Sequence, residues 1–169
     1  MALVIVALSA ITAAPARAAA STFVLTSSAF TDGGAIPVQY SCVGAGTSPP
    51  LAWSNPPTGT KELALVVEDP DAPSGTFTHW VVANIPPAPP SIAADDPLAH
   101  AVVADNSLGR PAYQPMCPPD GPAHHYVFTL AALKKKVKLA PDADAAALRR
   151  AMKGKVLGRT TLTGMFARP

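Results

Sequence analysis

The stretch Leu63-Ala64-Leu65-Val66-Val67-Glu68-Asp69-Pro70-Asp71-Ala72-Pro73 decides the fold, because an apolar run ends there in an acidic corner held by prolines. The unbroken Leu, Ala and Val residues predict a strand that is buried on both faces. The prolines make the corner rigid, since each proline fixes its own φ and restricts the residue before it. We interpret Asp69 and Asp71 as functional side chains at the end of a central strand.

A second apolar run follows this corner and brings the chain back as a second central strand. It spans Phe77 to Ile85 and includes the pair His79-Trp80. Because the chain reverses at the corner, His79 is expected at the same end of the sheet as Asp69 and Asp71.

A third group of polar residues lies downstream, in the segment Tyr113 to Phe128. A loop rich in proline and glycine again leads into an apolar strand, here Tyr126 to Leu133. Side chains two positions apart on a strand share a face. His124 and Tyr126 are therefore expected on one face, with His125 on the opposite face.

Taken together, these segments resemble the phosphatidylethanolamine-binding protein family, in its bacterial Raf-kinase-inhibitor-like branch. The resemblance runs from Phe30 to Arg168 and rests on several separate motifs in the family's order. The motifs are Tyr40-Ser41-Cys42, Ser48-Pro49-Pro50-Leu51-Ala52-Trp53, Asp69-Pro70-Asp71-Ala72-Pro73, His79-Trp80, Cys117-Pro118-Pro119-Asp120-Gly121, His124-His125-Tyr126-Val127-Phe128, Met152-Lys153-Gly154 and Thr163-Gly164-Met165-Phe166-Ala167-Arg168.

The sequence departs from the family pattern at four places. Thr47 stands where bacterial members usually have Asn, and Pro115-Met116 replaces a usual Gly-Pro. His125 replaces a usual Arg, which removes a permanent cation from any ion pair made there, and Lys155 replaces a common His. None of these changes falls on a candidate binding residue.

The resemblance implies a mainly β fold, an antiparallel β-sandwich with a C-terminal helix and a small anion-binding pocket. The implied ligand is a small anionic or phosphorylated molecule, such as a phospholipid headgroup. His79 and His124 are expected to donate to the anion, Asp69 and Asp71 to orient or charge these histidines, and Tyr126 to supply a hydroxyl or a wall. The expected ligand-binding residues are Asp69, Asp71, Ala72, Pro73, His79, Pro118, Pro119, His124 and Tyr126.

Three other functions stay open at the level of sequence. Two His and two Asp side chains form a plausible zinc or iron site, although their spacing is not compact. A hydrolase, metal-dependent or using Asp69 and Asp71 as acid and base, is the second alternative, although the chain lacks a Gly-x-Ser-x-Gly elbow and nothing identifies a nucleophile. The third alternative is an inhibitor that contacts a kinase or a protease. We expect a binding protein or modulator, without enzymatic activity, metal or cofactor.

Composition indicates one domain, over residues 19–169. The chain of 169 residues is long enough for one proper core, and its formal net charge of +2 gives no electrostatic case for nucleic acid. Its 20 prolines are dispersed through turns, which favours a turn-rich β protein.

The first 18 residues are typical of a secretory signal peptide. A short apolar run is followed by Ala16-Arg17-Ala18, an Ala-x-Ala cleavage pattern, and an uncleaved membrane anchor is the alternative. We therefore expect a periplasmic or secreted protein with no stable membrane insertion after cleavage. In an oxidising compartment Cys42 and Cys117 are candidates for a disulfide, with two buried free thiols as the alternative.

The remaining pattern predicts short strands and one helix. Residues Ser91 to Gly109 are expected to form a long surface loop, and Asp144 to Leu157 a helix capped by Asp142 or Asp144 and ended by Gly158. The lysines between residues 134 and 138 indicate a solvated turn, with a membrane-surface patch as the alternative. The other expected strands are Phe23–Thr26, Ile36–Tyr40, Leu51–Trp53 and Thr160–Phe166.

Overall fold

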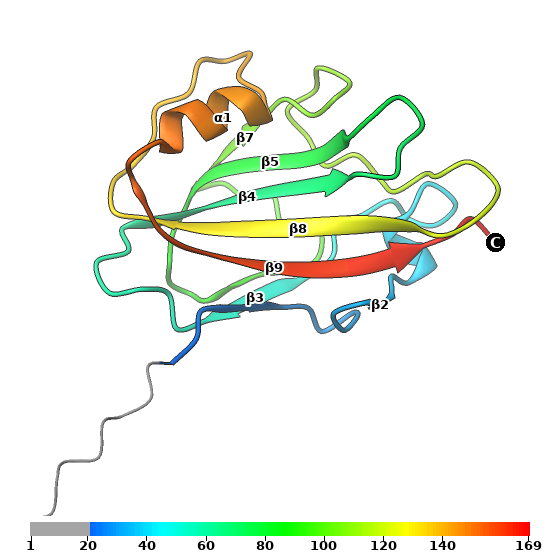
Figure 1. The fold of residues 1–169 in the computed structure, drawn as a ribbon, viewed down its shortest axis with the longest axis horizontal. Coiled ribbons are helices and arrows are strands. Elements are labelled where there is room, and N and C mark those ends of the chain that lie inside the picture. The colour runs from blue at the N-terminus through cyan, green and yellow to red at the C-terminus, as the bar shows by residue number, and fades with distance from the viewer. Residues whose placement is uncertain (1–20) are drawn as a thin grey trace, which may run out of the picture.

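The computed structural model describes residues 21–169 and places two sheets and a helix in three layers (Figure 1). A six-stranded sheet has the order β2-β9-β8-β4-β5-β7, and a smaller sheet has the order β1-β3-β6. The elements are β1 (Val24–Thr26), β2 (Gly34–Ala35), a 3-10 turn (Val38–Tyr40), β3 (Leu51–Ser54), β4 (Glu62–Asp69), β5 (Phe77–Ile85), β6 (Ser91–Ile92), β7 (Val102–Ala104), β8 (His124–Leu133), α1 (Ala145–Met152) and β9 (Val156–Phe166). The predicted mainly β sandwich with a C-terminal helix is confirmed.

The central strand β4 is buried on both faces, as its apolar run predicts. Leu63, Leu65 and Val67 point into a core between the two sheets, whereas Ala64 and Val66 point into a second core under α1. Strand β4 pairs antiparallel with both β5 and β8. The burial of both faces explains why its sequence does not alternate between apolar and polar residues.

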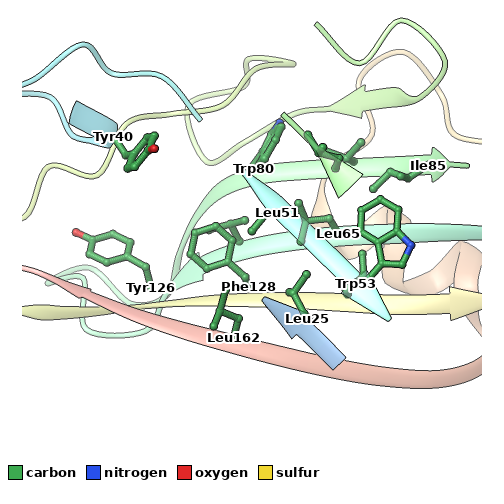
Figure 2. Packing of buried hydrophobic residues seen from close by; sticks show 14 of the residues in the cluster. Leu25, Tyr40, Leu51, Trp53, Leu65, Trp80, Ile85, Tyr126, Phe128 and Leu162 are labelled. Carbon is green, nitrogen blue, oxygen red and sulfur yellow. The ribbon is translucent and has the colours of Figure 1, made fainter. Parts of the chain in front are cut away.

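The larger core fills the space between the sheets with aromatic and branched side chains. Figure 2 shows Trp53, Trp80, Tyr126 and Phe128 packed there with leucines of both sheets. Tyr126 and Phe128 are fully buried and come from the start of β8. The beginning of β8 is therefore fixed by packing on its inner face.

Two expected elements were wrong. Ile36–Tyr40 is not a strand but a 3-10 turn over Val38–Tyr40, because Pro37 fixes φ at −60° and lacks the N–H that a ladder requires. The segment Ser91 to Gly109 is not one structureless loop, since it contains β6 and β7, which pair with β3 and β5. Strands this short give little periodic signal.

The predicted helix is present but shorter than expected. Asp144 caps α1 by accepting a hydrogen bond from the Ala147 N–H, and the helix ends at Met152. Gly154 follows with φ at +72°, a left-handed conformation that favours glycine, and the chain turns directly into β9. Leu148 and Met152 are buried against the sheet, as the spacing predicts.

The strand directions bring the polar residues to one end of the large sheet. Strand β4 ends at Asp69, and the antiparallel β8 begins at His124, so both lie at the same end. This end lies at the right of Figure 1, opposite the connection from β8 to α1. The expected signal peptide, residues 1–18, falls outside the described part of the chain. Within residues 21–169, no helix is long and apolar enough to cross a membrane.

Candidate functional site

A cavity of about 300 Å³ opens where β4 ends and β8 begins. One wall is the β4–β5 turn, and the other is the segment from Gln114 to Pro119 that leads into β8. The lining residues are Asp69, Ala72, Pro73, Phe77, His79, Leu108, Gln114, Pro115, Cys117, Pro118, Pro119 and His124. The wall is therefore mostly apolar, with one carboxylate and two imidazoles. Such sites orient a ligand through a few polar groups.

The carboxylate and one imidazole form a buried pair. His124 Nδ1 lies 2.8 Å from Asp69 Oδ2, and the side chains are only 12 % and 5 % exposed. The other carboxylate oxygen, Oδ1, accepts the Asp71 N–H at 2.8 Å. Both oxygens of Asp69 thus have partners within the protein. Because Nδ1 of His124 is engaged, Nε2 is the ring nitrogen left for a ligand.

His79 forms part of the same wall but differs from His124. Its Nδ1 lies 2.8 Å from the Gln114 carbonyl oxygen, so Nδ1 carries the hydrogen and donates. Burial lowers the pKa of His79, and this outweighs the opposing effects of that carbonyl and of Asp69. A neutral ring whose Nδ1 donates has an acceptor at Nε2. Donation from His79 Nε2 to an anion, as expected from the sequence, would need the protonated ring, which burial disfavours.

Tyr126 lies behind His79 and does not line the cavity. The two rings meet edge to face with centroids 5.2 Å apart, and Tyr126 is fully buried. Its hydroxyl and His79 Nε2 are buried without a hydrogen-bond partner among the described residues. Burial raises the pKa of Tyr126, and Asp69 and Asp71 raise it further, so the hydroxyl keeps its proton.

Asp71 does not orient His79 or His124, contrary to expectation. Its Oδ2 accepts from the His125 backbone N–H and from His125 Nδ1, each at 2.7 Å. The backbone hydrogen bond first, and then the ring, lower the pKa of Asp71. His125 lies on the outer strand face, as alternation along β8 predicts. Asp71 is part of a surface pair outside the cavity.

The segment that closes the cavity is held by a disulfide. Cys42 and Cys117 are bonded with their Cα atoms 5.4 Å apart. Both cysteines are exposed, so the alternative of two buried thiols does not describe this structure. The Arg168 guanidinium lies 3.1 Å from Cys117 Sγ and 3.8 Å from Asp120.

Of the expected ligand-binding residues, seven line the cavity and two do not. Those on the wall are Asp69, Ala72, Pro73, His79, Pro118, Pro119 and His124, whereas Asp71 and Tyr126 lie outside it. Sequence reasoning missed Phe77, although it shares a strand face with His79 two positions away. Gln114, Pro115 and Cys117 lie beside residues that were expected, but nothing in the pattern indicates Leu108.

The whole described fold, and not the cavity alone, matches known proteins. The family model described as phosphatidylethanolamine-binding protein matches residues 26–167. The chain belongs to this family. Family membership supports ligand binding in general, and the match covers both walls of the cavity.

Named relatives agree with this assignment. A UPF0098 protein of Methanothermobacter thermautotrophicus is 42 % identical over 149 residues, which cover 85 % of this chain and 98 % of the relative. A protein of Mycobacterium tuberculosis named as a candidate lipoprotein, LppC, is 43 % identical over 88 % of this chain and 74 % of its own length.

Two crystal structures share the fold. A candidate phosphatidylethanolamine-binding protein homologue from Chlamydia trachomatis has a TM-score of 0.83 and 37 % identity, covering 87 % of this chain and 98 % of its own. E. coli YbcL, described as a new member of the mammalian family, has a TM-score of 0.81 and 29 % identity, covering 88 % and 100 %.

The described side chains do not form a compact set of metal ligands. Within residues 21–169, no group of three or more His, Cys, Asp or Glu side chains is arranged to hold a metal ion. Asp69 and His124 are bonded to each other, and His79 points Nδ1 at a backbone carbonyl. No observation in this part of the chain favours the metal alternative.

Proposed function

We propose that the cavity binds a small molecule with a phosphate or another anionic group, of the kind found in phospholipid headgroups. The observation that carries this is the buried Asp69–His124 pair on the wall of a mostly apolar cavity. Asp69 holds the ring through Nδ1, and Nε2 is left to meet the ligand. A protonated His124 donates from both ring nitrogens and gives an anion a charge-assisted hydrogen bond.

The other polar groups favour a ligand that carries both signs of charge. Burial lowers the pKa of His79 and so favours its neutral form, which adds no cation to the wall. Asp69 is the carboxylate on the wall, and it repels a bare phosphate but attracts an ammonium group. A zwitterionic headgroup supplies both charges. It is therefore the best match to His124 and Asp69.

We infer a binding role without catalysis, outside the cytoplasm. On the cavity wall Asp69 is bonded to His124 and the sulfur of Cys117 is in a disulfide, so neither serves as a free nucleophile. The lipoprotein name of LppC and the disulfide both support an extracytoplasmic location.

Calorimetry on two neighbouring variants tests the proposal. His124→Ala removes the charge-assisted bond, which is worth about 1.5–3 kcal/mol, so affinity for phosphoethanolamine should fall roughly ten- to hundredfold. His125→Ala is the matched control, since the same residue type is removed from the outer face, and its affinity should stay close to the parent's.

Inorganic phosphate in the same titration separates an anion site from a headgroup site. Phosphoethanolamine should bind more tightly than phosphate, because only it offers an ammonium group. Binding of phosphoethanolamine by His124→Ala at the parent's affinity would overturn the proposal and favour inhibition through protein contact.

A further inference from the structure

The charged side chains are unevenly divided between the two ends of the molecule. Nine of the 13 Lys and Arg residues lie between residues 134 and 159, together with only two of the 11 Asp and Glu residues. This segment leaves β8, forms α1 and starts β9, at the left of Figure 1. Since β8 has 10 residues, its start at the cavity lies about 30 Å from this end.

The cations form one surface because the backbone brings their segments together. The Lys134 N–H donates to the Lys155 carbonyl at 2.9 Å, and Leu133 pairs with Val156. The Lys61 N–H donates to the Leu133 carbonyl at 2.8 Å, which adds a further exposed lysine. We call this surface the basic end: Lys61 and the lysines of residues 134–138 with Arg149, Arg150, Lys153, Lys155 and Arg159.

Few of these charges are neutralised. Among the described residues, Arg149 is the member of the basic end that pairs with a carboxylate, Glu68. Lys155 bonds the Ala151 carbonyl, which leaves its charge in place. The side chains of Arg150, Lys153 and Arg159 have no hydrogen bond within residues 21–169 and border a groove of about 500 Å³ between α1 and β9. Arg150, Lys153 and Arg159 therefore border one open groove.

We propose that the basic end is a docking surface for an anionic lipid bilayer. The charge is spread over a loop, a helix end and a strand start, which suits a diffuse negative surface. Clusters of four to eight Lys and Arg gain about 1 kcal/mol per residue at such surfaces. No Phe, Tyr or Trp occurs in residues 134–159. Sites for single-stranded nucleic acid stack bases on aromatic side chains, and protein interfaces are enriched in aromatic residues, so both partners fit this surface less well.

The start of the described chain lies at the same end. Phe23 lies beside Gly158, one residue before Arg159, and the Thr22 carbonyl accepts from Asn55 Nδ2 at 3.2 Å. The sequence before residue 21 contains the apolar run expected of a leader or an anchor. A bilayer that held this run would therefore face the basic end. Docked in this way, the protein presents its cavity away from the bilayer.

The helix α1 is not a membrane-inserting element in this proposal. Its apolar residues Ala145, Leu148 and Met152 are buried against the sheet. Binding is therefore electrostatic, and salt should weaken it, since the Debye length shortens from about 10 Å at 0.1 M to 3 Å at 1 M.

Vesicle co-sedimentation tests the proposal with the chain from Ala19, which contains every described element and the whole family match. The parent should bind vesicles of phosphatidylglycerol in phosphatidylcholine, but not vesicles of phosphatidylcholine alone. Lys135→Gln with Arg150→Gln removes two charges of the basic end and should weaken binding about thirtyfold. The matched control, Arg110→Gln with Arg168→Gln, removes two charges elsewhere and should have a much smaller effect.

A pocket variant separates this surface from the proposed headgroup site. His124→Ala should bind the vesicles like the parent, whereas Lys135→Gln with Arg150→Gln should bind phosphoethanolamine like the parent. The proposal is overturned by equal losses in the two double variants, or by vesicle binding that depends on His124. It is equally overturned if the parent binds heparin or RNA in solution and ignores the vesicles.

Discussion

Two carboxylate–histidine pairs lie side by side in this protein, with nearly the same geometry and very different surroundings. His124 and Asp69 meet at 2.8 Å, and His125 and Asp71 at 2.7 Å. The first pair is 12 % and 5 % exposed and lines the cavity, whereas the second is 50 % and 41 % exposed on the outer face. Consecutive histidines on one strand thus serve two environments, because side chains alternate between faces.

The difference shows that distance alone does not make a functional pair. In water, an ion pair gains little, because solvent screens it and both side chains lose freedom. Beside a cavity with apolar walls, an unpaired charge is costly, and a ligand that completes the hydrogen bonds gains correspondingly. Asp69 and His124 therefore combine burial with a position on the cavity wall, and Asp71 and His125 have neither.

The largest predicted effect comes from removing the disulfide of the cavity wall. The buried pair lines the cavity beside this wall, and the outer pair does not. Cys42→Ser with Cys117→Ser removes a cross-link between residues separated by 75 positions. In the chain-entropy model, this lowers the free energy of unfolding by about 4 kcal/mol. Urea denaturation of the variant and of the oxidised parent measures the difference.

Ligand binding serves as the second measurement on the same variant. Cys117 lines the cavity and is held near Arg168, so loss of the disulfide should weaken phosphoethanolamine binding. The outer pair does not line the cavity, so the NMR signals of the His125 ring should be unchanged in this variant. Unchanged unfolding and unchanged binding together would show that the cross-link does not hold the wall.

The second prediction concerns variants that remove the carboxylate from each pair in turn. Asp69→Ala leaves His124 without its buried partner and the Asp71 N–H without its acceptor. We expect a loss of about 3 kcal/mol in the free energy of unfolding, at the lower end for a buried pair because one side faces the cavity. Asp71→Ala, measured by the same urea denaturation, should leave the stability close to the parent's.

The ratio of these two effects is the informative quantity. Equal losses would mean that burial does not separate the pairs, and that the cavity side of His124 is as well solvated as the outer face. A change in the urea m-value, in contrast, would indicate that the variant altered the compactness of the folded or the unfolded state and did not only remove one contact.

The sequence predicted the end of the sheet at which the site lies, and the reason is periodicity. Buried strands such as β4 have unbroken apolar runs, and alternation along β8 assigned His124 inward and His125 outward. The strands β6 and β7 were missed because segments of 2 and 3 residues carry no period. Their positions depend on tertiary pairing with β3 and β5.

The partners of each polar group were harder to predict than their location. Asp71 was expected to orient or charge His79 or His124. Its carboxylate instead accepts a hydrogen bond from His125, because the turn after Pro70 directs the Asp71 side chain to the outer face. The ring state of His79 depends on the Gln114 carbonyl, which is 35 residues away in sequence. Such backbone contacts leave no residue-type signal. The sequence motif therefore identifies the candidate residues, and only the structure shows which group each of them contacts.

The smallest predicted effect concerns a third carboxylate, which is buried without a histidine. Glu62 is 1 % exposed at the opposite end of β4, and its Oε1 accepts the Val137 N–H at 2.8 Å. Its Oε2 is buried without a partner among the described residues, whereas Asp69 has a partner for each oxygen. Burial raises the pKa of Glu62, although the Val137 N–H, Lys136 and Lys155 lower it.

A raised pKa means that the folded protein holds the proton more tightly than the unfolded chain. This contribution to stability is fully present below the unfolded pKa of 4.5 and is lost as the pH rises through the higher folded pKa. Glu62→Gln carries no such charge, so its stability relative to the parent should increase with pH across this window. Thermal unfolding between acid and neutral pH measures the trend. If the difference between Glu62→Gln and the parent is constant across this window, the charge on Glu62 is compensated in the folded protein, and the missing partner at Oε2 carries no cost.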